Sequence, residues 1–213
     1  MAIRAAVRSR AKDTKMTSRQ LQALRTKDNI YESALKVIGE LGYENTSIEA
    51  ITTAAGVSTG SFYTYFNSKE HILLHTFEKG ESLYQKAYEQ VSGQPFPENL
   101  YAFVQTSYSS LEHRGREIMY GVTSNILSAD FKVRVRDKNR AFFKCLRALI
   151  ESGVQNNRLP AGTDIDDSVD KLFIVLTGVE THWCLSDFGG SLPALAVDSV
   201  RTLVHGLRAE NSL

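Results

Sequence analysis

A cluster of hydroxyl side chains offers the first candidate chemistry in this 213-residue chain. The cluster lies just after Val57 and consists of Ser58, Thr59, Ser61, Tyr63, Thr64 and Tyr65. No side chain among them can act as a base, so nothing here would activate a hydroxyl as a nucleophile. Short or planar hydroxyl side chains without negative charge are suited to donate to phosphates or to touch base edges. The cluster therefore predicts contact with nucleic acid.

Two short helices and a turn are expected to present these hydroxyls. Thr46 and Glu49 have the spacing of a capping box, so the first helix should begin at Thr46. Gly56 can supply the positive φ that ends it, and Ser58 is a suitable N-cap for the second helix. A pair of short helices joined by a tight turn is typical of a helix-turn-helix, whose second helix enters the major groove of DNA.

Two further polar contacts with DNA are expected at helix starts. A third helix should follow, with Asn67 and Glu70 as its capping box. Lys69 lies in its first turn, where its own charge and free backbone N–H groups favour a phosphate. The alternative for Lys69 is a solvated surface lysine. Ser47 is expected to be free for a phosphate contact because Thr46 is assigned to the cap.

This part of the sequence resembles a known family. The residues that carry the resemblance are Gly56 to Glu70, Ala34, Leu41-Gly42-Tyr43 and Thr46-Ser47-Ile48. They are similar to the DNA-binding signature of the tetracycline-repressor (TetR) family of bacterial regulators. The resemblance implies a homodimeric repressor that binds a palindromic operator in double-stranded DNA and is released by a small-molecule effector. A dimeric DNA-binding protein without a ligand is the alternative.

Charge is distributed unevenly along the chain. Residues 1–27 hold eight Lys and Arg against one Asp, a net of +7, so with +1 overall the remainder carries −6. A basic arm on an acidic protein favours nucleic-acid binding, because neutralised phosphates release counterions. Residues 1–16 are expected to form a flexible basic arm, with a solubilising tail or a vector remnant as alternatives. Arg25 and Lys27 are predicted DNA contacts on a helix that runs from a Thr17 capping box to Leu41.

Composition is that of a protein with a substantial core. Hydrophobic residues make up 42% of the chain, but no apolar run approaches the ~20 residues that span a bilayer. The basic N-terminus is not followed by the apolar segment of a signal peptide. Cys145 and Cys184 are too few and too far apart for a disulfide framework or a zinc module. These features predict a cytoplasmic protein.

The rest of the chain is expected to be helical. Apolar residues recur at helical spacing, and no alternating strand pattern or internal repeat appears. Breaks are expected near Gly93, at Gly115 and over 156–162, with one long helix over 130–155. We therefore predict an all-α fold of about nine helices, in which a helix-turn-helix head over 17–67 follows the arm over 1–16. Residues 68–213 are then the ligand-binding and dimerisation domain.

The last two helices carry apolar residues on two faces, which predicts a dimer. A helix that is apolar on two faces must be covered on both sides. A second copy of the chain can supply that cover through a two-fold interface of four helices, and a fully internal helix pair is the alternative. The residues predicted for this interface are Val175, Gly178, His182, Ala196, Val200 and Val204.

Several large side chains could line a ligand pocket in the body. The candidates are Tyr101, Tyr108, Met119, Phe142, Phe173, Glu180 and Trp183. The aromatic members also fit an ordinary core. Glu180 lies on an apolar stripe, and a buried carboxylate is costly unless it has a partner. Two explanations remain open for it, an internal hydrogen-bond partner or a polar group of a ligand.

An enzyme or a metalloprotein is not supported by the spacing of the titratable residues. Glu180, His182 and Cys184 are each two residues apart, so on a helix neighbours point about 200° away from each other. His71 and His75 share a helix face but lack the arrangement of a zinc peptidase. No nucleophile elbow, phosphate loop or dinucleotide motif occurs. We therefore expect no catalytic residue, no metal and no cofactor.

Overall fold

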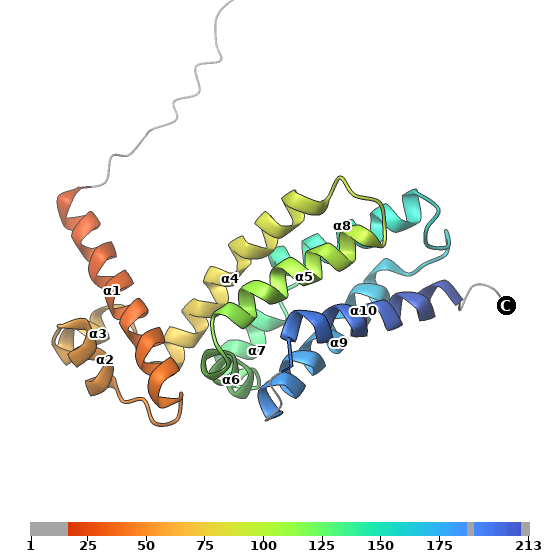
Figure 1. Cartoon of the computed structure of the whole chain (residues 1–213). Coiled ribbons are helices and arrows are strands. Elements are labelled where there is room, and N and C mark those ends of the chain that lie inside the picture. The colour runs from red at the N-terminus through yellow and green to blue at the C-terminus, as the bar shows by residue number, and fades with distance from the viewer. Residues whose placement is uncertain (1–16, 187–189, 210–213) are drawn as a thin grey trace, which may run out of the picture.

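Ten helices and no strand make up the part of the chain that this computed structural model describes, residues 17–186 and 190–209. They form an elongated molecule with a head of three helices at one end and a larger helical body at the other (Figure 1). The predicted all-α class is confirmed. The predicted arm over 1–16 lies outside the described residues.

The head consists of α1 (Ser18–Leu41), α2 (Ile48–Ala55) and α3 (Thr59–Tyr65). As predicted, Thr17 and Gln20 form a capping box at the start of α1, and α1 ends before Gly42. Gly56 ends α2 with φ of 65°, in the left-handed region. The small head core is formed by Ile30, Tyr31, Ala34, Ile51, Phe62, Phe66 and Ile72.

Two N-caps lie one residue later than predicted. Ser47, not Thr46, caps α2 by accepting a hydrogen bond from the Ala50 N–H at 3.1 Å. Thr46 is instead buried and donates its hydroxyl to the Gly42 carbonyl at 2.8 Å. Ser68 replaces Asn67 as the cap of α4 (Lys69–Val91). At both helix starts two adjacent residues have side chains that can act as an N-cap. The path of the loop places the second of them in the capping position.

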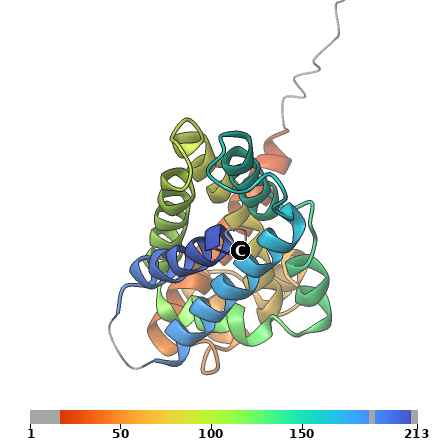
Figure 2. The ribbon, with the colours of Figure 1, turned by 90° about the vertical axis from the view of Figure 1, so that its right-hand side faces the viewer.

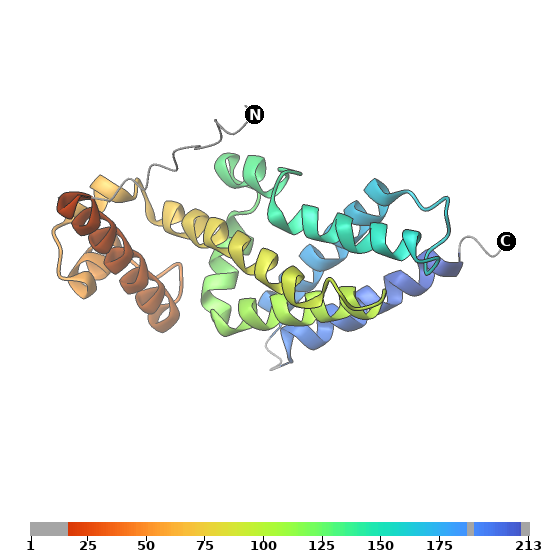
Figure 3. The ribbon, with the colours of Figure 1, turned by 90° about the horizontal axis from the view of Figure 1, so that it is seen from above.

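Helix α4 belongs to both halves of the molecule. Ile72, in its first turn, is fully buried in the head core. Leu73 packs in a small cluster between head and body, and Tyr84 packs in the body core. Seen from above, α4 leaves the head and runs along the body (Figure 3). Among the described helices, α4 is therefore the one element with residues in the head core, the intermediate cluster and the body core.

Six further helices complete the body. They are α5 (Glu98–His113), α6 (Arg116–Asn125), α7 (Ala129–Val135), α8 (Ala141–Gln155), α9 (Ile165–Leu185) and α10 (Leu192–Ala209). α4 packs against α5, α6 and α8, and α10 packs along both α5 and α9 (Figure 2). The main core lies between these helices.

The predicted single helix over 130–155 is wrong, because the structure divides it into α7 and α8. Asp137 accepts a hydrogen bond from the Asn139 N–H at 2.9 Å, a local turn that competes with helix formation. Arg140 and the backbone N–H of Ala141 both donate to the carboxylate of Glu81 on α4, each at 2.7 Å. The start of α8 is thereby fixed to α4, and this split accounts for ten helices in the described residues where about nine were expected.

Candidate DNA-binding surface and effector pocket

Helix α3 presents its hydroxyl side chains on the outside of the head. Phe62 is fully buried and holds the helix in place, while Tyr63 is 53% exposed. Ser58 accepts a hydrogen bond from the Ser61 N–H at 3.2 Å, and the two hydroxyl oxygens lie 3.0 Å apart. Ser58, Thr59, Tyr63 and Thr64 are exposed, whereas Ser61 and Tyr65 are half-buried. The predicted cluster is thus brought together on one short helix, with Tyr63 its largest exposed member.

The other residues predicted to contact DNA differ in how exposed they are and in whether they already have a contact within the protein. Arg25 is exposed on α1. Lys27 is half-buried, with its ammonium nitrogen 5.6 Å from the centre of the Phe66 ring. Ser47 is exposed, but its oxygen serves as the α2 cap, so the expectation that it would be unengaged is wrong. Its hydroxyl hydrogen can still be donated, since only the oxygen is used in the cap.

Lys69 makes an internal contact that the sequence did not reveal. Its ammonium group donates to the carbonyls of Tyr43 at 2.6 Å and Glu44 at 3.4 Å, and lies 4.3 Å from the centre of the Tyr43 ring. The hydroxyl of Tyr43 donates to Glu70 at 3.2 Å. Burial, and next the Glu70 carboxylate, raise the pKa of Tyr43. Lys69 and Tyr43 thus tie the α1–α2 loop to the start of α4.

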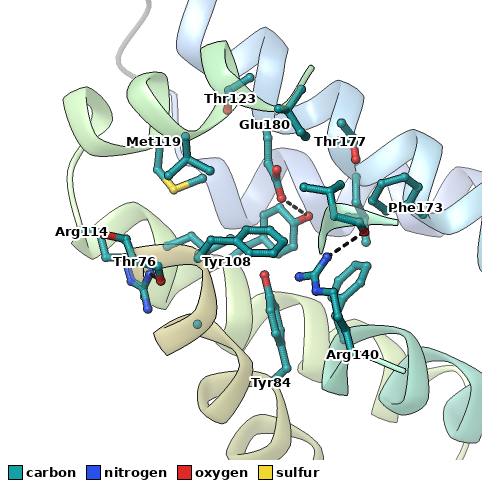
Figure 4. Close-up of a pocket in the computed structure, with 18 residues that line it drawn as sticks. Thr76, Tyr84, Tyr108, Arg114, Met119, Thr123, Arg140, Phe173, Thr177 and Glu180 are labelled. Atoms are coloured by element: carbon teal, nitrogen blue, oxygen red, sulfur yellow. Dashed lines mark hydrogen bonds between the residues drawn. The ribbon is translucent and has the colours of Figure 1, made fainter. Parts of the chain in front are cut away.

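A cavity in the body lies between α4, α5, α6, α8 and α9 (Figure 4). Its free volume is about 60 Å³, room for only a few water molecules by the usual measure. Five of the predicted pocket residues line it, namely Tyr108, Met119, Phe142, Phe173 and Glu180. Its remaining walls include Thr76, Phe77, Tyr84, Arg114, Thr123, Arg140, Leu176 and Thr177. The cavity is mainly apolar, with a few polar groups converging on it.

The other two predicted pocket residues do not line this cavity. Tyr101 instead has the guanidinium of Arg201 5.1 Å from its ring centre. The indole N–H of Trp183 donates to the carbonyl of Gly190 at 2.9 Å. Arg116 lies over the Trp183 ring at 4.7 Å. Trp183 thus packs at the end of α9, three residues beyond Glu180, where the helix turns it away from the cavity.

Glu180 has an internal partner and also borders the cavity. The hydroxyl of Tyr108 donates to its carboxylate at 2.7 Å. Burial raises the pKa of Glu180, and the Tyr108 hydrogen bond and the charge of Arg140 oppose that rise only in part. Burial and the nearby Glu180 carboxylate also raise the pKa of Tyr84. Both explanations raised from the sequence therefore stand together, because the carboxylate is paired and still faces free space.

Sequence reasoning missed Tyr84 and Arg140 as members of this polar group. Arg140 donates to Glu81 and, through Nη1, to the Val135 carbonyl at 3.0 Å (Figure 4 shows the second bond). No local signal marked either residue, because they come from α4 and from the α7–α8 connection. Among the described residues, no group of three His, Cys, Asp or Glu side chains is placed to hold a metal ion. Nor do the described helices include one with the length and apolar character to cross a membrane.

The predicted dimer residues are divided between two environments. On α9, Gly178 and His182 are exposed and Val175 is half-buried. On α10, the structure contradicts the prediction. Ala196, Val200 and Val204 are each 0% exposed and belong to the chain's own core. The reason is that α10 packs between α5 and α9, so this stripe is its inner face.

These features define the class of the molecule as a helix-turn-helix DNA-binding protein with a separate helical body. The family model for bacterial regulatory proteins of the tetR family matches residues 30–76. The chain is 24% identical, over 84% of its length and 93% of the relative's, to the fatty acid metabolism regulator protein of Bacillus subtilis (strain 168).

Solved structures share the fold. The transcriptional regulator FadR from Bacillus subtilis, in complex with stearoyl-CoA, aligns with a TM-score of 0.71 and 23% identity, covering 84% of this chain and 98% of that one. The repressor FadR from Thermus thermophilus, in complex with lauroyl-CoA, aligns with a TM-score of 0.60 and 22% identity, covering 85% and 98%. Residues 30–76 thus form the DNA-binding region of a tetR-family bacterial regulatory protein. The relatives that it matches are DNA-binding regulators rather than enzymes.

Proposed function

We propose that this chain is a homodimeric repressor that leaves its operator when a fatty acyl-CoA thioester binds in the body. The observation that carries the proposal is the cavity, because its walls include residues of α4, the helix that also enters the head core. Two regulators of the same fold are seen with acyl-CoA thioesters, which supports this ligand class. A solid body would have favoured the alternative of a dimeric DNA-binding protein without a ligand.

The proposed response is a population shift. The free space of about 60 Å³ is too small for an acyl chain, so the effector must bind a widened state that is less populated without it. Thr76, Phe77 and Tyr84 line the cavity from α4. Widening the cavity there displaces α4, and with it the head that is packed on Ile72. In a dimer this changes the spacing of the two recognition helices, which must match half-sites one helical turn or a multiple apart.

The DNA contacts are proposed on the exposed side of the head. Tyr63, Thr59 and Thr64 on α3 are placed to reach base edges and phosphates, with Ser58, Ser61 and Tyr65 beside them. Arg25 and Ser47 supply phosphate contacts from α1 and from the start of α2, and Lys27 is a further candidate. Lys69, a DNA contact in the sequence analysis, is instead proposed to hold the head together, because its ammonium group donates to the Tyr43 carbonyl. The proposed domain division places residues 17–67 in the head and 68–213 in the body. Operator binding would place the protein with the chromosome in the bacterial cytoplasm.

The dimer interface is proposed on the outer faces of α9 and α10. Ile174 is 68% exposed and Leu185 is 74% exposed, and Gly178 lies between them on the same face of α9. A small residue between two apolar side chains allows a second helix to approach closely. On α10 the outward positions are Asp198, Arg201 and His205 rather than the buried stripe. The paired change Ile174→Glu and Leu185→Glu should give a folded monomer in sedimentation velocity, and an unchanged dimer would place the interface elsewhere.

Operator release by a defined ligand tests the proposal. DNA selected from a random pool by the purified protein supplies the operator, and fluorescence anisotropy measures its dissociation constant. Saturating lauroyl-CoA should weaken operator binding by roughly 5–150-fold, the usual range of coupling between two sites. Laurate and CoA are the matched controls, since each lacks one half of the thioester. Equal operator affinity with and without lauroyl-CoA would refute this ligand class, and equal affinity across a metabolite screen would favour the ligand-independent alternative.

A further inference from the structure

A second, open groove adjoins the cavity on the outside of the body. It lies between the α7–α8 connection and α9, with a free volume of about 380 Å³. Its lining residues are Arg136, Lys138, Phe143, Asp170, Phe173 and, at the edge shared with the proposed dimer face, Ile174. Phe173 also lines the buried cavity, so this side chain belongs to the walls of both spaces. A ligand that occupied both spaces would contact this phenylalanine.

The groove borders a basic stretch on an otherwise acidic part of the chain. Residues 130–147 contain seven Lys and Arg against two Asp, a net of +5, although the chain beyond residue 27 carries −6 in total. Several of these cations are paired, for example Arg140 with Glu81 and Arg134 with Glu78. Arg136 is exposed and has no ion-pair partner within the described ranges. The lining of the groove itself holds Arg136 and Lys138 against Asp170, a net of +1, which favours an anion there.

Two aromatic side chains line the groove beside its cations. The Lys138 ammonium lies 4.8 Å from the centre of the Phe143 ring. The ring centres of Phe143 and Phe173 are 5.2 Å apart. Cations recognise phosphates, and the Phe143 ring, only 3% exposed, supports the Lys138 ammonium from below. The neighbouring cations Arg136 and Lys138 therefore match a ligand with several phosphates better than one with a single carboxylate.

We infer that this groove binds the nucleotide and phosphate portion of the effector, while its acyl portion passes Phe173 into the cavity. The inference rests on the proposed acyl-CoA effector, and it adds where and by which residues the charged half is recognised. Arg136 and Lys138 contact the phosphates. Asp170, which pairs with Lys138 in this structure, gives up that contact when the phosphates arrive. The groove thereby selects the thioester over the free fatty acid, which has no phosphate to offer.

Charge removal inside and outside the groove tests the assignment. The test variant is Arg136→Ala with Lys138→Ala. The matched control is Lys132→Ala with Lys144→Ala, which removes two exposed cations of the same stretch that do not line the groove. Binding of lauroyl-CoA and of CoA alone is measured by isothermal titration calorimetry at several salt concentrations. The thermal midpoint of each variant verifies folding.

The groove variant should bind lauroyl-CoA at least tenfold more weakly and lose most of the salt dependence of binding, whereas the control should stay within about threefold of wild type. Asp170→Asn should strengthen binding severalfold, because it removes a competing carboxylate. Equal losses in both double variants, or none in either, would overturn the groove assignment while leaving the acyl-CoA response intact. If CoA binds through Arg136 and Lys138 but lauroyl-CoA does not release the operator, the assignment stands and the proposed function fails. Wild-type protein that binds neither compound would overturn both.

Discussion

Lys69 offers a direct test of whether a basic residue near the recognition helix binds DNA or holds the head together. Its ammonium group donates to the Tyr43 carbonyl at 2.6 Å and lies over the Tyr43 ring. A hydrogen bond from a charged donor contributes about 1.5–3 kcal/mol, and an exposed cation–π contact about 0.5–1 kcal/mol. Lys69 is only half-buried, so solvent reduces both contributions. Replacing Lys69 with Met should therefore lower the free energy of unfolding by about 2 kcal/mol.

Two measurements separate the structural role from a phosphate contact. In a protein of this size, about 2 kcal/mol corresponds to a fall of roughly 4–8 °C in the thermal midpoint. Loss of one phosphate contact would instead reduce the slope of operator affinity against salt by about one. For Lys69→Met we expect the lower midpoint with an unchanged slope. Lys36→Met is a suitable control, because Lys36 is 74% exposed and its pair with Glu40 spans 4.0 Å. A wild-type midpoint together with a slope reduced by about one would refute this reasoning.

Three further substitutions test the surroundings of individual side chains. Tyr63 is exposed on α3, so Tyr63→Ala should weaken operator binding by about 1–3 kcal/mol, measured by fluorescence anisotropy. Sedimentation should still show a dimer, and loss of the dimer would contradict the assignment of Tyr63 to DNA binding. Burial raises the folded-state pKa of Glu180 above its ordinary value of 4.5, so the wild type should lose stability relative to Glu180→Gln as pH rises from 4.5 through that folded-state value. Thermal midpoints at pH 4.5, 6 and 8 test this, and a difference between the two proteins that does not change with pH would disprove it. Gly153→Ala would place its Cβ 2.9 Å from Cγ of Phe96. It should therefore lower the free energy of unfolding, measured in urea, by about 1–3 kcal/mol. An unchanged free energy of unfolding would mean that Phe96 can move.

The helix boundaries of the head were predictable because their signals are local. Capping side chains act three residues away, and a left-handed glycine acts at its own position. Thr17 with Gln20, Gly56 and Ser58 were each identified correctly from such patterns. Where two adjacent residues could both cap, as at Thr46 and Ser47, the sequence did not decide between them. The loop geometry did, since burial of Thr46 left only Ser47 in position.

Contacts between distant segments were decided only by the tertiary structure. Periodicity showed that α10 has an apolar stripe through Val200, but a stripe does not reveal which surface covers it, and here α5 and α9 do. The group of Tyr84, Tyr108, Arg140 and Glu180 draws on four separate segments, so no spacing in the sequence could indicate it. The sequence by itself determined an all-helical DNA-binding head, because turns and caps are specified within a few residues. Packing determined the cavity, the groove and the outward faces, because these depend on which surfaces meet after the chain has folded.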